Sequence, residues 1–152
     1  MTTAYDVPAE KLIASIAEEL KKMEYIKPPE WSSLVKTGVH RERSPEKPDW
    51  WHTRVAAVLR KIYIYGPIGT EKLSAHFGGP VDKGSKPTHA WSGSRAIIRL
   101  ALQQLELSGL VAPYKKLGRV VSPQGQKILD NTSYAIFKEM VKDNPKLAKY
   151  GK

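Results

Sequence analysis

The chain lacks cysteine and long hydrophobic segments. The absence of cysteine from its 152 residues excludes disulfide bonds, thiolate zinc sites and cysteine nucleophiles. No apolar run approaches the ~20 residues that a membrane-spanning helix needs. The segment from Met1 to Asp6 contains neither the basic nor the apolar region of a secretory signal. We therefore expect a cytoplasmic protein that is neither exported nor attached to a membrane.

Acidic residues are few compared with basic ones. The chain has 25 Lys and Arg against 15 Asp and Glu, which gives a formal net charge of +10 and a pI of about 9.7. Such a surface attracts polyanions, and a pI above ~9 is typical of nucleic-acid-binding domains. The length fits one domain over residues 1–152, with a core large enough to need no disulfide or metal. Composition therefore favours a single domain that binds nucleic acid.

Sequence patterns of catalysis and metal binding are also missing. No serine occupies a GxSxG elbow, and no two carboxylates stand out as an acid–base pair. In the segment 79–86, Ser85 separates Lys86 from the second glycine, which breaks the pattern of a phosphate-binding loop. We expect no enzyme activity and no cofactor. The spacing of a metal site such as HExxH is absent from the four histidines, His40, His52, His76 and His89.

Apolar residues at three- and four-residue spacing predict a mainly helical protein. An amphipathic helix is expected over 7–24, with Asp6 as its cap. A clearer helix is expected from its cap, Asp49, to about Gly66. Its core-facing residues are expected to be Trp51, Val55, Val58, Leu59 and Ile62.

The remaining segments follow the order of a winged helix-turn-helix. A short helix near 70–77 is followed by a loop over 81–91 and a central helix over 92–108. A basic two-stranded β-hairpin over 110–122 forms the wing. The fold class is therefore mainly α, a winged helix-turn-helix with additional N- and C-terminal helices. The connection between the two middle helices is longer than the ~3–4 residues of the turn in a DNA-reading helix-turn-helix, which argues against DNA recognition.

The central helix and the last helix have further features that the sequence predicts. The central helix has a main apolar stripe that includes Ile98 and Leu102 and a second stripe formed by Ile97, Leu100 and Leu107, which predicts packing on two sides. The last helix is expected to begin at Ser122, as its cap, with Pro123 in the first turn. It is expected to end before Asn144, so that 144–152 form a basic, frayed tail.

Cations beside aromatic residues mark a candidate nucleic-acid surface. Trp50, Arg54 and Lys61 share one flank of the helix that follows Asp49, a combination that can stack a base and hold a phosphate. The structural alternative for Trp50 is a half-buried residue at the core boundary. The segment 27–49 is broken by prolines, and it is either a linker wrapped over the core or a nucleic-acid-contacting strap. Its cationic or titratable residues include His40, Arg41, Arg43 and Lys47.

Four blocks of the sequence, in order, match a known family. They are Pro29–Trp31 with Val35–Gly38, Asp49–Trp50 with Thr53–Ala56, Pro87 leading to Ser94–Glu106, and Ser122–Gly125. Together these blocks resemble the S19e family of small-subunit ribosomal proteins of archaea and eukaryotes. The resemblance implies a winged-helix fold, a place in the head of the small subunit, contact with small-subunit rRNA and neighbouring ribosomal proteins, and a part in subunit assembly. It implies no catalysis or cofactor.

The candidate RNA-binding residues come from two sources. The matching blocks contribute Lys36, Trp50, Arg54 and Arg99. Helical projection and charge add Arg60, Lys61, Arg95, Lys115, Lys116 and Arg119. The sequence leaves open whether the loop over 79–91 contacts RNA.

Two other functions also fit a basic winged helix. A DNA-binding regulator would read a major groove with the helix over 92–108 and would be a dimer, whereas we expect a free monomer. A protein-interaction module would bind its partner independently of salt. RNA affinity instead falls as the salt concentration rises, because counterion release becomes less favourable.

Overall fold

The computed structural model describes residues 2–150, so Met1 and the last two residues of the basic tail, including Lys152, lie outside the described residues. The described chain is mainly helical. Its α-helices are α1 (Ala9–Lys21), α2 (Trp50–Tyr65), α3 (Thr70–His76), α4 (Arg95–Leu107) and α5 (Pro123–Asp143). Two 3-10 helices, η1 (Glu30–Ser33) and η2 (Pro145–Tyr150), add short turns. The antiparallel strand pairs are β1 (Gly79–Lys83) with β2 (Lys86–Trp91) and β3 (Val111–Tyr114) with β4 (Gly118–Val121).

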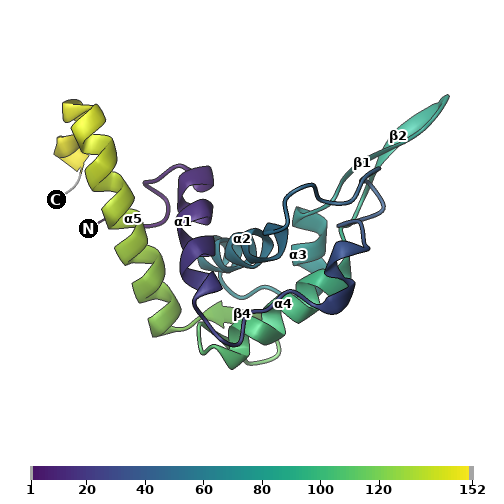
Figure 1. The fold of residues 1–152 in the computed structure, drawn as a ribbon, viewed down its shortest axis with the longest axis horizontal. Coiled ribbons are helices and arrows are strands. Elements are labelled where there is room, and N and C mark those ends of the chain that lie inside the picture. The colour runs from purple at the N-terminus through teal and green to yellow at the C-terminus, as the bar shows by residue number, and fades with distance from the viewer. Residues whose placement is uncertain (1, 151–152) are drawn as a thin grey trace.

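The predicted winged helix is confirmed. Helix α4 packs against both α2 and α3, and the β3–β4 wing follows α4 and contacts both α2 and α4. Helix α1 packs on α2, and α5 packs on α1 at one end of the molecule (Figure 1). The β1–β2 hairpin projects from the opposite end (Figure 1). The added N- and C-terminal helices therefore lie on the side away from this hairpin.

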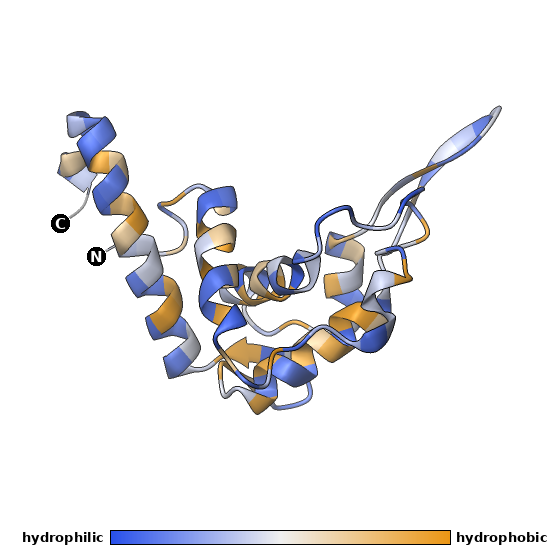
Figure 2. Ribbon diagram, in the orientation of Figure 1, coloured by the Kyte–Doolittle hydropathy of each residue, from blue (hydrophilic) through white to orange (hydrophobic). Residues whose placement is uncertain are grey.

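The core follows the predicted stripes with one exception. All five predicted core residues of α2 are buried, and Ile98 and Leu102 of α4 are buried with them. Figure 2 shows the apolar positions of the helices gathered toward the middle of the molecule. The second α4 stripe is only partly correct, because Ile97 is buried whereas Leu107 is 69% exposed. Leu107 is the last residue of α4.

A buried polar network crosses this core. The indole nitrogen of Trp51 donates a hydrogen bond to Oε1 of Gln104 at 2.9 Å, and Nε2 of Gln104 donates to the carbonyl of Lys27 at 2.7 Å. A buried donor without a partner costs ~1–3 kcal/mol, so this glutamine allows Trp51 to be fully buried. Helical periodicity did not indicate Gln104, because the apolar pattern carries no signal for a buried polar side chain.

Of the three predicted helix caps, Asp6 is wrong, Asp49 is correct in position only, and Ser122 is confirmed. Asp6 does not cap α1, because it lies two residues before the N-cap, Pro8. Its carboxylate instead accepts from the backbone nitrogen and the hydroxyl of Thr3. Asp49 stands at the N-cap of α2 but makes no side-chain capping bond. Ser122 is confirmed as the cap of α5, because its hydroxyl accepts from the nitrogen of Gly125 at 3.1 Å.

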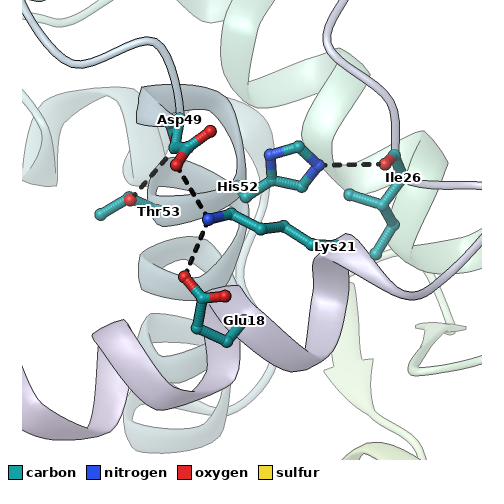
Figure 3. Close-up of polar contacts among 6 residues, drawn as sticks. All are labelled: Glu18, Lys21, Ile26, Asp49, His52 and Thr53. Atoms are coloured by element: carbon teal, nitrogen blue, oxygen red, sulfur yellow. Dashed lines mark hydrogen bonds and ion pairs between the residues drawn. The ribbon is translucent and has the colours of Figure 1, made fainter.

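The carboxylate of Asp49 has a different partner, on α1. Nζ of Lys21 lies 2.8 Å from both Asp49 and Glu18, as Figure 3 shows. These bonds raise the pKa of Lys21, with Asp49 as the larger cause, and they lower the pKa of Asp49. His52 adds a bond between its ring nitrogen and the carbonyl of Ile26 at 3.3 Å. The end of α1 and the start of α2 are therefore tied together.

Two segments differ from the expectation of irregular structure. The predicted loop over 81–91 is a hairpin: Val81 pairs with His89 and Lys83 with Lys86. The start of the expected frayed tail forms η2, and its Leu147 packs against the core cluster. Both segments lack a long apolar stripe, so periodicity carried little information about them.

Candidate nucleic-acid interface

A cleft of about 910 Å³ opens between α1, the first half of α2 and the segment 37–47. Residues 37–47, part of the proline-rich segment 27–49, line one side of the cleft, and we call them the strap. Four permanent cations line the cleft against two carboxylates, Glu42 and Glu46. The four cations are Arg41, Arg43, Lys47 and Arg54.

Arg54 is the cation most deeply placed in this cleft. Helix α2 holds it half-buried, with its guanidinium 4.6 Å from the centre of the Phe77 ring. Burial lowers the pKa of Arg54, and the nearby charge of Arg41 lowers it further. Among residues 2–150, no carboxylate pairs with it. A desolvated guanidinium that stacks on an aromatic ring and has free donors suits an external anion.

His40 of the strap also lines the cleft, where the charge of Arg54 acts on it. Burial lowers the pKa of His40, and the charges of Arg41 and Arg54 act in the same direction. Its Nδ1 is buried without a hydrogen-bond partner in the described part of the chain. The imidazole is therefore neutral near pH 7 and adds no cation of its own to the free cleft.

Trp50 lines the cleft as well, and its burial is that of the structural alternative, a half-buried residue at the core boundary. The ring is half-buried and packs edge-on against Trp51, with centroids 5.5 Å apart and planes at 80°. It is therefore a core-boundary residue whose remaining surface faces the cleft. Of the predicted site residues, Trp50 and Arg54 are the two that line this cleft.

The other predicted α2 residues lie further along the helix. Nζ of Lys61 lies 5.2 Å from the centre of the Tyr65 ring, and Tyr65 stacks on His76 with centroids 4.5 Å apart. Arg60 is half-buried, and its Nε has no hydrogen-bond partner among residues 2–150. Both cations are thus held near the protein surface, away from the cleft lining.

A second group of predicted residues surrounds the start of α4. Lys36, Arg95 and Arg99 are exposed. Lys36 and Trp31 help to line a smaller pocket of about 280 Å³ beside Ser94, the α4 cap, whose hydroxyl accepts from the nitrogen of Ile97 at 3.4 Å. The strap joins this region through a β-bridge between Gly38 and Gly93.

The wing cations divide into two kinds. Lys115 and Lys116 are exposed at the turn, where Nζ of Lys115 lies 5.5 Å from the Tyr114 ring. Arg119 instead makes two bonds to Glu106 of α4, at 2.9 and 3.2 Å. Its backbone also pairs with Ile68. Arg119 therefore holds the wing to the body, and its charge is largely neutralised.

The candidate set from the sequence omitted residues that the fold brings to Arg54. Arg41, Arg43 and Lys47 reach the cleft because the strap folds back over α2, and Phe77 reaches it from the end of α3. The cluster of cations in a proline-rich segment was the available signal. Periodicity could not place that segment, because its path depends on the distant Gly38–Gly93 bridge.

Other kinds of site find no support in the described residues. Within 2–150, no three His, Asp or Glu side chains lie together as metal ligands would. None of the helices over the same residues has the length and apolar composition required to cross a bilayer.

The fold and the cleft together define a class: basic winged-helix proteins with an arginine-lined groove that suits a polyanion. Within this class the chain belongs to the ribosomal protein S19e family, whose model matches residues 3–139.

Relatives from several archaea cover almost the whole chain. A small ribosomal subunit protein eS19 from Thermoplasma acidophilum is 45% identical over 150 residues, which is 99% of each chain. The proteins of the same name from Aeropyrum pernix and Haloarcula marismortui are 43% and 40% identical, again over 99% of each chain. The resemblance found in the four sequence blocks is therefore confirmed.

Proposed function

We propose that this chain is a structural, non-catalytic constituent of the small ribosomal subunit in the cytoplasm. It binds small-subunit rRNA in the head of the subunit, contacts neighbouring ribosomal proteins and contributes to subunit assembly. Two findings support the proposal: the name shared by its relatives, and the half-buried Arg54 in a cationic cleft. The placement of Arg54 is the single observation that carries the RNA contact.

The chemistry of Arg54 is that of a preorganised phosphate ligand. Folding has already desolvated its guanidinium and fixed it on Phe77, so little side-chain entropy remains to be lost on binding. A phosphate that enters the cleft supplies the negative charge that the described residues do not provide. Arg41 and Arg43 of the strap then flank the same anion. Charge-assisted bonds of this kind contribute ~1.5–3 kcal/mol each.

The exposed cations extend this surface beyond the cleft. Lys36, Arg95 and Arg99 near the start of α4 neutralise further phosphates, with release of counterions. Arg60, Lys61 and the wing lysines Lys115 and Lys116 contribute the same long-range attraction. Trp50 offers its free surface to a base or a ribose. Arg119 acts through the position of the wing, because Glu106 holds its guanidinium.

Charge reversal on α4 tests the proposal. Arg99→Glu replaces an exposed cation that has no packing role, so the fold should be retained while repulsion of the phosphate weakens rRNA binding about 10-fold or more. The measurement is occupancy of the variant in small subunits isolated from cells that express it. Lys11→Glu, an equally exposed reversal on α1, serves as the control and should leave occupancy unchanged.

Normal occupancy of a folded Arg99→Glu variant would argue strongly against the proposed surface. If the variant were unfolded by circular dichroism, Arg99 would be a structural residue. The alternative of a DNA-binding regulator predicts a dimer bound to a palindromic duplex. Light scattering of the free protein and duplex-binding assays distinguish it from the monomeric ribosomal protein proposed here.

A further inference from the structure

The β1–β2 hairpin is the most exposed element of the molecule. It extends away from the helices (Figure 1), and every residue of β2 is exposed. A two-stranded hairpin without a covered face is only marginally stable in water. A chain that maintains such an element needs either firm anchorage at its base or a partner along its length.

The base of the hairpin is anchored by close backbone packing. The nitrogen of Gly93 donates to the carbonyl of Ser74 at 2.8 Å, and Gly93 also forms the β-bridge to Gly38 of the strap. A Cβ atom on Gly93 would meet the carbonyl oxygen of Phe77 at 2.8 Å. A Cβ on Gly79 would meet the imidazole of His40 at 2.9 Å. These contacts fix the direction in which the hairpin leaves the body.

One face of the hairpin combines an aromatic ring with a cation. The register pairs Gly79 with Trp91 and Val81 with His89, so His89 and Trp91 lie on the same face. Nζ of Lys83 lies 4.7 Å from the centre of the Trp91 ring, which places Lys83 on that face too. Trp91 is 44% exposed. Tryptophan, histidine and lysine together can stack unpaired bases and neutralise their phosphates.

The charge of the hairpin favours an anionic partner. Its carboxylate, Asp82, accepts from the nitrogen of Gly84 at 2.9 Å and so closes the turn. Gly84 has a φ of +80°, which suits this turn and disfavours a side chain there. The cations Lys83 and Lys86 are both exposed. The hairpin has no leucine, isoleucine or phenylalanine between 79 and 91, so it lacks the apolar patch that a protein partner would cover.

The hairpin is also continuous with the cleft. His40, which lines the cleft, packs against Gly79 at the base of β1. Phe77, whose ring packs against the guanidinium of Arg54, lies two residues before Gly79. A strand of RNA whose phosphate lies at Arg54 is thus close to the base of the hairpin.

We propose that the face formed by Lys83, His89 and Trp91 is a second RNA-binding surface, which takes unpaired nucleotides of the same rRNA that enters the cleft. This inference rests on the proposed function. The cleft holds the backbone by charge, and the hairpin extends the contact outward by stacking. The marginal strand pair is then stabilised along its length by the RNA.

The first test measures the salt dependence of binding to small-subunit rRNA. The double variant Lys83→Ala/Lys86→Ala removes the lysine of this face and the exposed lysine paired with it beside the turn. It should lower the slope of log affinity against log salt by about 1.4, because each phosphate neutralised on a single strand contributes about 0.7. A control variant, Lys11→Ala/Lys22→Ala, removes two exposed lysines of the N-terminal region and should leave the slope unchanged.

The second test identifies the partner. A benzophenone side chain at position 89 is photo-activated in small subunits reassembled with the full-length protein, and RNA crosslinks are expected. In a third variant, an Asn-Gly turn replaces 82–88, which shortens the hairpin and leaves Gly79 and Gly93 at its base unchanged. This variant should weaken rRNA binding at least as much as the double variant. Circular dichroism confirms that the shortened chain is folded.

Crosslinks to protein alone, or an unchanged slope in the double variant, would overturn the inference. In either case Arg54→Glu and Arg99→Glu still report on the proposed function, because both lie outside the hairpin. Loss of rRNA binding in those two variants together with wild-type binding in the hairpin variants leaves the proposed function intact and rejects the second surface. Absence of salt-sensitive rRNA binding by the wild-type protein rejects the proposed function itself.

Discussion

Arg54 and Arg119 show that two arginines of one small protein can have opposite uses. The guanidinium of Arg119 forms two bonds with Glu106, whereas that of Arg54 has no carboxylate partner among residues 2–150. Burial without a partner costs free energy, because the guanidinium loses water and gains little in return. The folded protein bears this cost at Arg54, next to a cationic strap. Residues that bind a ligand often reduce the stability of the free protein in this way.

Replacement of Arg54 should separate stability from binding. Arg54→Met keeps most of the side-chain volume and removes the desolvated charge, so the free protein should unfold at the same temperature as wild type or higher. Its affinity for small-subunit rRNA should fall about 10-fold or more. Thermal denaturation and filter binding measure the two effects. A large drop in unfolding temperature would show that Arg54 mainly supports the fold.

His40 makes the stability of the strap depend on pH. Its pKa in the folded protein lies below the ordinary value of 6.5, through burial and the charges of Arg41 and Arg54. As the pH falls below about 6.5, the unfolded chain therefore binds a proton that the folded chain resists, and stability decreases. Urea unfolding at pH 7.5 and pH 5.5 should show a smaller acid-induced loss for His40→Gln than for wild type. Equal losses in the two proteins would show that His40 does not cause the acid-induced loss of stability.

At the scale of elements, the wing is joined to α4 by a partly buried ion pair. The side chains of Arg119 and Glu106 are 27% and 28% exposed, and the pair has two bonds. Arg119→Ala should lower the free energy of unfolding by about 1 kcal/mol. A double-mutant cycle with Glu106→Ala should give a coupling energy of the same order. Additive effects in chemical denaturation would show that the pair contributes nothing to the attachment of the wing.

The elements that the sequence predicted well are those with one apolar face. Helix α2 has a regular stripe through Trp51 and Leu59, and the wing has a glycine-bearing turn between two short strands. The β1–β2 hairpin escaped prediction because neither of its faces is buried, and alternation marks a strand only when one face meets a core. Asp6 does not cap α1, because its carboxylate accepts from Thr3. Asp49 is the N-cap of α2 by position alone, because its carboxylate accepts from Lys21.

The candidate site likewise has residues that helical periodicity could place and residues that it could not. Helical projection placed Trp50 and Arg54 on one flank, and both line the cleft. Projection could not show that the strap would add Arg41 and Arg43, since that contact joins segments without a shared periodicity. It also could not show that Arg119 is paired with Glu106, which lies 13 residues away on another element.

At the scale of the whole molecule, the cationic surface is spread over an elongated shape. Helix α5 and the β1–β2 hairpin lie at opposite ends (Figure 1), with the cleft and the start of α4 between them and the hairpin anchored beside the cleft. In the proposed function, the net charge of +10 supplies long-range attraction to rRNA, and the arrangement of arginines selects the face that binds. Family membership agrees with this arrangement but does not itself locate the contact.

Sedimentation of the endogenous protein at increasing salt tests the central claim most directly. The account predicts that the protein travels with small ribosomal subunits at low salt and is released only at high salt, because phosphate contacts weaken as counterion release becomes less favourable. Arg54→Glu and Arg99→Glu should be released at lower salt than wild type. A protein that sediments apart from small subunits at every salt concentration would contradict the account.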